Sequence, residues 1–283
     1  MTAFIKRVLK VYFRDKTSVF FSLLAVFIII GLYVFFLGDV WSSNIQVEKP
    51  RLIMDSWIMS GLLAVVSLTT TMGAFGIMVD DRHNKITKDF YSSPIKRSSL
   101  TAGYIGGAFL IGLIMSVLTF ILVEIYIVAK GGTFPDFTTL IKIFGLIILS
   151  TLANTTLLFF IVSFLKSQNA FGTASSVVGT LVGFITGIYM PIGILPDAVQ
   201  IVVKIFPVSH SAVLFRQVMM ESVMNEQFGN APAEFKEEFA EEMGIVLKWG
   251  DTVIPSYVNV LVILATAVLF YLLSIRSLSR KSH

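Results

Sequence analysis

The stretch DDRHNKITKDFYSSPIKRSS, residues 80–99, lies between two long runs of sequence that carry no charge. The run before it, between Asp55 and Asp80, has 24 residues, and the run after it, between Arg97 and Glu124, has 26. A helix needs about 20 apolar residues to cross the hydrocarbon core of a bilayer. The sequence therefore predicts two membrane-spanning helices joined by a charged loop.

The rest of the chain repeats this pattern. Of its 283 residues, 55% are hydrophobic and only 14% are charged, whereas soluble domains carry about 25% charged residues. Four further charge-free runs are long enough to cross a bilayer. We therefore predict an all-α integral membrane protein with a six-span domain over residues 18–283, whose spans are 18–38, 57–79, 101–128, 143–164, 170–190 and 255–275.

The distribution of basic residues predicts the orientation of these spans. Six spans place both termini on one side, where the loops hold 14 Lys and Arg residues, against 8 in the loops on the other side. Because basic loops stay in the cytoplasm, we expect both termini and the 80–99 loop to be cytoplasmic and the chain to lie in the plasma membrane. Trp41, Trp57 and Trp249 all lie near the predicted outer ends, where tryptophan anchors helices in the interface.

Residues 1–17 have the pattern of an amphipathic helix. Apolar side chains cover one side, and Lys6, Arg7, Lys10 and Arg14 cover the other. A basic amphipathic helix ahead of a span is expected to lie in the membrane interface. The alternative is a basic tail that serves only to set the orientation.

Small residues recur every fourth position in the fifth predicted span, at Ser175, Gly179, Gly183 and Gly187. Such a ridge allows two helices to approach closely in lipid. It fits helix contact within one subunit or the seam of a dimer, and nothing in the sequence separates the two.

Three prolines interrupt the apolar segment that follows, at Pro191, Pro196 and Pro207. Because they divide it into pieces too short to cross a bilayer, we predict an external re-entrant hairpin over 191–206. The external region that comes next, 221–250, is rich in acidic residues and is predicted to contain a short solvated helix.

Three polar residues within spans are candidates for a substrate path. Glu124 is the one acid inside a predicted span, and an ionisable group within a span is a functional candidate by default. Its place in the outer part of the third span lets its side chain reach the headgroups, where we expect at most a tuning role. Thr70 and Asn154 belong to polar patches that line a cavity or, on the other interpretation, form hydrogen bonds between helices.

The chemistry that the chain lacks is also informative. No Gly-Lys dipeptide occurs, so there is no G-x-x-x-x-G-K-[ST] phosphate-binding loop. There is no cysteine, and His83, His210 and His283 are far apart in the sequence, so we predict no metal site, no cofactor and no enzymatic activity in this chain. Active transport would take its energy from a partner or from an ion gradient.

The order of these features resembles the membrane subunit of type-2 ATP-binding-cassette exporters. The basic segment IKRVLKVYFRDKTSVFF (5–21) precedes the first span. The loop after span two ends in YSSPIKRSSLTAGYIGG (91–107), and YMPIGILPDAVQIVVKIFPVSHSAVLFRQVM (189–219) follows span five. All three segments are similar to the family's arrangement.

This resemblance implies an assembly and a role for the charged loop. It implies two copies of a cytoplasmic ATPase subunit that bind ATP and Mg, a second permease copy or a paralogue, and contact with membrane lipid but not with nucleic acid. The loop after span two would form a coupling helix that docks on the ATPase, over about residues 81–90, because Pro94 disfavours helix at Ser93. The expected coupling residues are Arg82, Lys85, Lys88, Asp89 and Phe90.

The function expected from the resemblance is outward transport of a hydrophobic or amphipathic substrate by alternating access. An antimicrobial drug or peptide is favoured, as in antibiotic resistance, and lipid or lipid-linked glycan is the alternative. From other classes, a non-transporting sensor or assembly subunit also fits. A membrane enzyme would need clustered acids or histidines near one membrane face, which the sequence does not contain.

Overall fold

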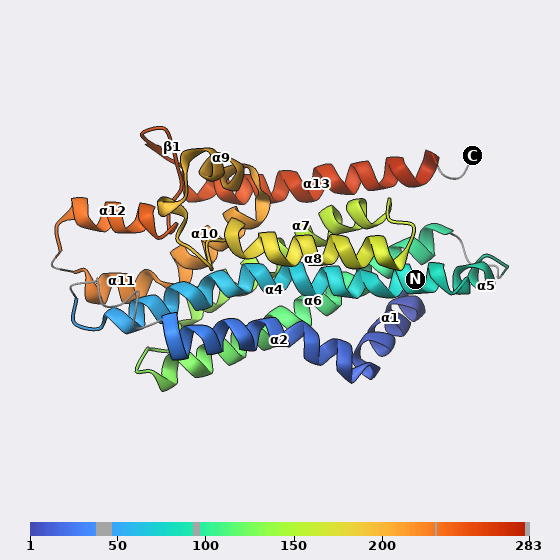
Figure 1. The fold of residues 1–283 in the computed structure, drawn as a ribbon, viewed down its shortest axis with the longest axis horizontal. Coiled ribbons are helices and arrows are strands. Elements are labelled where there is room, and N and C mark those ends of the chain that lie inside the picture. Colours follow the sequence, from blue (N-terminus) through green and yellow to red (C-terminus); the bar gives the residue numbers. More distant parts are fainter. Residues whose placement is uncertain (38–46, 93–96, 230, 281–283) are drawn as a thin grey trace.

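The computed structural model describes residues 1–37, 47–92, 97–229 and 231–280. Long helices run side by side along the longest axis (Figure 1). The start of α1, the helix α5 and the end of α13 lie at one end of the molecule, which we call the α5 end. The opposite end carries α11, α12 and β1, and we call it the α12 end. The predicted all-α architecture is confirmed.

The central helix is α4 (Pro50–His83), whose 34 residues span about 51 Å. It packs against α6 (Arg97–Ala129), α7 (Phe137–Val162) and α10 (Pro207–Met219). Nearly every residue from Leu52 to Val79 is buried, with no exposed stripe. Protein therefore surrounds α4 along most of its length, as expected for the inner helix of a bundle.

Four described helices are long and apolar enough to cross a membrane, and up to six spans result if each of two sharply bent helix pairs counts as one. The four are α4, α6, α7 and α13 (Ser256–Arg280). The last three expose rows of large apolar side chains on their outer faces: Ile114, Leu118, Ile121, Ile125 and Val128 on α6; Phe137, Ile141, Phe144, Ile148 and Leu152 on α7; Tyr257, Leu261, Leu264, Val268 and Leu272 on α13. A surface of this kind is stable against acyl chains and not against water.

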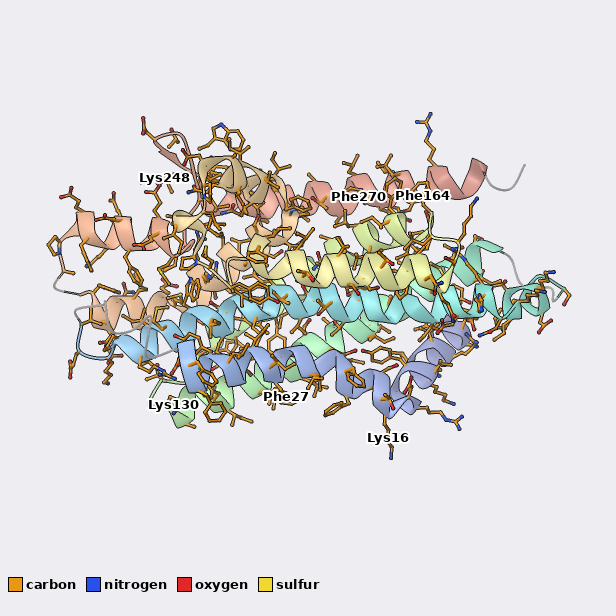
Figure 2. All side chains as sticks on the ribbon, in the orientation of Figure 1. Lys16, Phe27, Lys130, Phe164, Lys248 and Phe270 are labelled. Carbon is orange, nitrogen blue, oxygen red and sulfur yellow. The ribbon has the colours of Figure 1, made fainter. Side chains whose placement is uncertain are left out.

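Aromatic side chains also join the outer helices. The ring of Phe160 on α7 lies 5.4 Å from that of Phe270 on α13 and 5.0 Å from that of Phe164. In Figure 2, Phe164 and Phe270 lie along the length of the bundle, whereas Lys130 and Lys248 lie at the α12 end.

The N-terminal segment forms two helices that meet at an angle. Helix α1 (Thr2–Arg14) and helix α2 (Lys16–Leu32) are bent by 74° relative to each other. The carboxylate of Asp15 accepts hydrogen bonds from the backbone N–H groups of Thr17 and Ser18, and so caps α2. A π-helical turn, η1 (Tyr33–Leu37), follows α2.

Helix α1 lies against α6 through a surface made of glycines. Phe4, Val8 and Tyr12 are buried at four-residue spacing on one face of α1. An added Cβ at Gly103 would lie 2.5 Å from the Phe4 ring, and one at Gly107 would lie 2.5 Å from Val8 Cγ1. Only glycine allows α1 to lie this close to α6. The apolar face of the amphipathic helix α1 is therefore covered by protein.

Helix α8 (Gln168–Ile185) is shorter than the predicted fifth span. Its 18 residues cover about 27 Å, and it is not among the helices that cross a membrane by length and composition. Gly187 therefore does not extend the ridge of small residues: it lies beyond the helix with φ 74°, a conformation that favours glycine. Ser175 and Gly179 line a cavity with residues of α1, α2 and α4, and Gly183 contacts the Tyr189 ring.

Each of the three predicted proline breaks begins a helical segment. Pro191 precedes the 3-10 turn η2 (Ile192–Ile194), Pro196 precedes α9 (Asp197–Ile205), and Pro207 is the first residue of α10. Proline suits a helix start because its missing N–H has no partner to lose there. Helices α9 and α10 meet at an angle of 89°, which fits either a broken span or a re-entrant loop.

The acidic region after α10 forms a small layer at the α12 end. It contains α11 (Glu221–Gln227), α12 (Ala233–Glu242) and a hairpin of β1 (Lys248–Trp249) and β2 (Thr252–Val253), in which Lys248 pairs with Val253. Phe239 and Met243 are buried under α12.

The prediction for Trp57 as an interfacial anchor is wrong. Trp57 is 1% exposed, and its indole Nε1 donates a hydrogen bond of 2.6 Å to the carbonyl of Met243. The guanidinium of Arg216, itself fully buried, lies 4.7 Å from the centre of the Trp57 ring. This contact joins α4 to α10 and to the end of the α12 region. Trp249 is exposed, and Trp41 lies outside the described residues.

The glycine surface under α1 makes a stability prediction. We expect Gly107→Ala to lower the free energy of unfolding by about 1–3 kcal/mol, because the new methyl group overlaps buried Val8. Gly145→Ala on α7 is the control, since nothing lies within 4 Å of its added Cβ. Thermal unfolding in detergent measures both variants. Equal melting temperatures for the two would contradict the role assigned to this surface.

The positions of α5, α9 and α12 make a topology prediction. The chain has no cysteine, so single cysteines at the exposed positions Lys88, Asp197 and Glu238 can be labelled cleanly. We expect an impermeant maleimide to reach Asp197→Cys and Glu238→Cys from the same membrane face and Lys88→Cys from the other. Labelling of Asp197→Cys and Glu238→Cys from opposite faces would show that α9 and α10 cross the membrane.

Candidate functional site

A buried carboxylate at the α5 end joins three helices. Asp81, near the end of α4, is 4% exposed. Its two carboxylate oxygens accept hydrogen bonds of 2.7 and 2.8 Å from the guanidinium of Arg7 on α1. The hydroxyl of Tyr104 on α6 donates a third, of 2.6 Å. A two-pronged arginine–carboxylate pair fixes orientation as well as distance, so this cluster holds α1, α4 and α6 in one arrangement.

Aromatic rings extend this cluster to α5 (Ile86–Ser92). The ring of Phe4 lies edge-on to that of Phe90 on α5, at 5.3 Å between centres, and to that of Tyr104, at 4.8 Å. The Arg7 guanidinium lies over both the Phe4 and the Phe90 rings, at 5.4 and 5.1 Å. We call Phe4, Arg7, Asp81, Phe90 and Tyr104 the Asp81 cluster; through it α5 contacts α1, and α1 contacts α4 and α6.

The structure gives Arg7 and Phe90 contacts that the sequence did not predict. Arg7 was expected on the solvated side of the N-terminal helix with Lys6, Lys10 and Arg14, which are exposed, but it turns toward Asp81. Phe90, expected among the coupling residues, is half-buried and packs against α1, and its contact with a partner stays a prediction. Both side chains serve contacts inside the chain, which a helical wheel cannot reveal.

The predicted coupling helix is divided into two pieces. Helix α4 continues to His83, and α5 begins at Ile86. Between them Lys85 has φ 61°, a left-handed conformation in which side chains other than glycine are uncommon. Arg82 and Asp89 therefore do not lie on one continuous helix. The predicted helix end near 91–93 borders residues 93–96, which lie outside the described part of the chain.

The tip of the α4–α5 turn is nonetheless charged and open. Arg82, Lys85, Lys88 and Asp89 are all exposed. The α4–α5 turn that carries them lies at the far tip of α4 (Figure 1).

The polar patches in the middle of the bundle hold helices together. Asn154 on α7 donates a hydrogen bond of 2.8 Å to the hydroxyl of Ser67 on α4, and Ser67 lies 3.1 Å from the hydroxyl of Ser150. Thr70 donates to the carbonyl of Val66 within α4. Thr70 and Asn154 are buried, with exposed fractions of 0% and 2%. Of the two interpretations, hydrogen bonding between and within helices is the one that the geometry supports.

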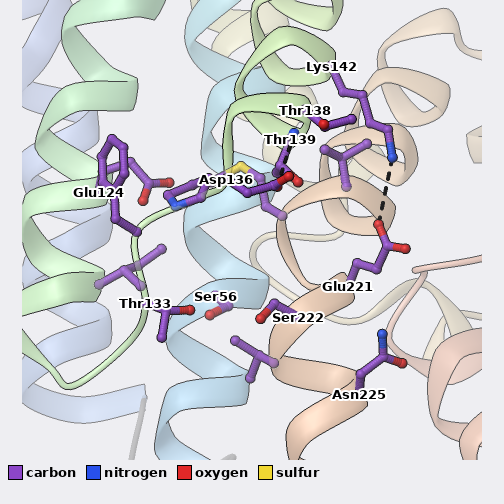
Figure 3. Close-up of a pocket in the computed structure, with 16 residues that line it drawn as sticks. Ser56, Glu124, Thr133, Asp136, Thr138, Thr139, Lys142, Glu221, Ser222 and Asn225 are labelled. Atoms are coloured by element: carbon purple, nitrogen blue, oxygen red, sulfur yellow. Dashed lines mark hydrogen bonds and ion pairs between the residues drawn. The ribbon is translucent and has the colours of Figure 1, made fainter.

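A polar cavity opens near the α12 end, where α4, α6, α7 and α11 meet (Figure 3). Its volume is about 600 Å³. Glu124, Asp136, Lys142 and Glu221 line it together with hydroxyl groups from Ser56, Thr133, Thr138, Thr139 and Ser222. The ammonium of Lys142 lies 3.9 Å from the carboxylate of Glu221. Hydrogen bonds from Thr139 hold the pKa of Asp136 below its ordinary value, so it stays ionised at neutral pH.

Glu124 does not reach out to the headgroups as the sequence predicted. Its side chain is 5% exposed, and it forms no hydrogen bond or ion pair with another described residue. Figure 3 shows its carboxylate directed from α6 toward the cavity. Among the described residues no group of three or more His, Cys, Asp and Glu side chains is arranged to hold a metal ion.

The Asp81 cluster makes a prediction for stability. We expect Asp81→Asn to lower the free energy of unfolding by about 2 kcal/mol, because a partly buried guanidinium loses its carboxylate. Tyr104→Phe removes one hydrogen bond and should cost about 1 kcal/mol. Asp80→Asn, at an exposed carboxylate bonded only to Gln168 among the described residues, is the control and should change little. An Asp81→Asn protein as stable as Asp80→Asn in detergent would contradict this assignment.

Comparison with known proteins identifies the chain at the level of its family. No curated protein matches it. The family model for ABC-2 family transporter proteins matches residues 41–276, which is most of the chain and includes α4 to α12 and most of α13, but not α1 or α2. A match of this extent agrees with the long apolar helices and with the absence of a phosphate-binding loop. The chain therefore belongs to the ABC-2 transporter family, as the membrane-embedded permease subunit of a type-2 ATP-binding-cassette transporter.

Proposed function

We propose that this permease exports a hydrophobic or amphipathic substrate, driven by separate cytoplasmic ATPase subunits that dock on the α4–α5 tip. The observation that carries the proposal is the pairing of an open, charged tip at Arg82, Lys85, Lys88 and Asp89 with the Asp81 cluster directly behind it. A docking surface needs exposed, charged groups for recognition. It also needs a stiff connection to the helices that must move.

The Asp81 cluster supplies that connection. A displacement of α5 acts on Phe90, which contacts Phe4 and Arg7 on α1. Arg7 is bound to Asp81 on α4, and Asp81 is bound to Tyr104 on α6. ATP-driven closure of the ATPase subunits would thus move three helices together, as alternating access requires.

The left-handed turn at Lys85 separates α4 from α5 and serves as a hinge between them. It lets α5 leave the axis of α4 while the two remain in contact. The long helix then transmits rigid-body motion, and the turn absorbs the change of direction.

The proposed assembly has two ATPase subunits, which bind ATP and Mg, and a second permease, either another copy or a paralogue. The tip and both chain ends face the cytoplasm in this arrangement, and the α12 layer faces outward. The distribution of 14 against 8 basic residues supports this orientation, in a bacterial plasma membrane.

An antimicrobial drug or peptide is the substrate that we favour, with lipid or lipid-linked glycan as the alternative. The apolar outer faces of α6 and α7 support a substrate that partitions into the bilayer. A non-transporting sensor or assembly subunit would also dock an ATPase, but it would not show turnover that responds to a transported molecule.

The charged tip yields a functional prediction. We expect the double variant Arg82→Glu and Lys85→Glu to weaken ATPase association about tenfold or more, because it replaces attraction by repulsion across a docking surface. Membrane insertion should be retained, since Lys88, Lys96 and Arg97 keep the loop basic. Co-purification of the ATPase and substrate-stimulated ATP hydrolysis measure the effect.

The control reverses two basic residues at the α12 end, Lys49→Glu and Lys236→Glu. Lys49 forms only a weak exposed ion pair, at 3.4 Å from Glu226. Loss of ATPase association in this control as well would indicate a general folding defect. Full association and export by the Arg82→Glu and Lys85→Glu protein would exclude the tip as the docking site.

A further inference from the structure

Glu124 lies where two spaces of opposite character meet. One is the polar cavity of Figure 3, and the other is an apolar groove of about 690 Å³ between α6 and α7. Glu124 and Phe134 line both. The remaining residues that line the groove are apolar, namely Phe120, Ile121, Ile125, Val128, Ala129, Leu140 and Phe144. Among the described residues of the groove, Glu124 is thus the sole ionisable group.

The carboxylate of Glu124 has no partner for its charge within the described part of the chain. Lys142, in the same cavity, lies beside Glu221, and Lys130 lies over the Tyr126 ring at 5.9 Å. A buried carboxylate without a cation is costly, and ionisable groups inside spans are usually paired or functional. This position therefore favours a cation that comes from outside the chain.

The cavity around Glu124 has a net negative charge. Three acids, Glu124, Asp136 and Glu221, line it against one base, Lys142. Electrostatic complementarity thus selects a cation and disfavours an anion. The hydroxyl groups of Ser56, Thr133 and Ser222 provide hydrogen-bonding positions for polar parts of a ligand.

The groove favours a ligand with a large apolar part next to its cationic group. Ile121, Ile125 and Phe144 are exposed on outward faces of α6 and α7, which meet acyl chains in a multi-pass membrane protein. The rings of Phe120 and Phe144 lie edge to face, 5.8 Å apart. Aromatic rings of this kind stabilise an organic cation in a desolvated site. The volume is within the range of sites for drug-sized ligands.

We propose that Glu124 and the α6–α7 groove form a binding site for hydrophobic organic cations, with the cationic centre at the Glu124 carboxylate and the apolar body in the groove. Such a molecule reaches the site from the bilayer through the groove, and the polar cavity gives it a route toward the α12 end. The inference rests on the proposed export function only in taking this cation to be cargo.

Binding of radiolabelled tetraphenylphosphonium to the full chain in lipid nanodiscs tests the proposal. We expect saturable binding that unlabelled tetraphenylphosphonium displaces and that tetraphenylborate, an anion of nearly the same shape, does not. Glu124→Gln should weaken binding about tenfold or more, since it removes the charge and keeps the shape. Ile125→Trp should also weaken it, by filling the groove from an exposed position where the fold tolerates change.

The matched control is Glu238→Gln, at an exposed acid on α12, and it should bind like the unmodified protein. Equal displacement by tetraphenylborate would overturn the proposal without any variant. Unchanged binding by Glu124→Gln would do the same.

A separate measurement distinguishes this site from the export function. ATP-driven uptake of tetraphenylphosphonium into inside-out vesicles is expected, and it should fall with Glu124→Gln. Glu124-dependent binding without ATP-driven uptake would support the site and contradict its role in export. ATP-driven export of other molecules without any binding of tetraphenylphosphonium would overturn the site alone.

Discussion

The burial of α4 on nearly every side is the constraint on which the rest of the structure depends. Polar groups on a helix enclosed by protein are stabilised by partners within the bundle. Asp81 finds Arg7 and Tyr104 at one end, and Trp57 finds the Met243 carbonyl at the other. Both ends of α4 are thereby attached to different neighbours, and α4 is the element that joins the two ends of the molecule.

The two ends differ in a way that suits a transporter. The α5 end has a compact cluster of ion pair and aromatic rings behind an open charged tip, a combination that transmits force and resists deformation. The α12 end has cavities, a buried carboxylate without a partner and a layer of short helices. A permease that is driven by a partner needs a rigid docking end. A permease that binds a ligand at its other end needs polar groups there that have no partner within the chain.

Much of the fold could be predicted from the sequence, because its signals are local. Charge-free runs predicted the long helices α4, α6, α7 and α13, and three prolines predicted breaks in the segment that forms η2, α9 and α10. The break at Lys85 was not predictable, since a left-handed lysine has no sequence signal. The end of α8 before Gly187 was missed because glycine fits both a helix ridge and a turn.

By itself, the sequence determined the helical class, the candidate spans and the lack of an ATP-binding motif, since hydropathy and short motifs are read along one segment. Only the tertiary structure decided the surroundings of Arg7, Trp57 and Glu124. Arg7 and Asp81 are 74 residues apart, and Trp57 and Met243 are 186 apart. The sequence pattern predicts a solvated side chain for a basic residue on an amphipathic helix, but the fold places a buried carboxylate beside Arg7. The pattern also predicts that Glu124 is exposed, but neighbouring helices enclose it. Long-range contacts of this kind depend on how the helices are placed in space, which no single segment specifies.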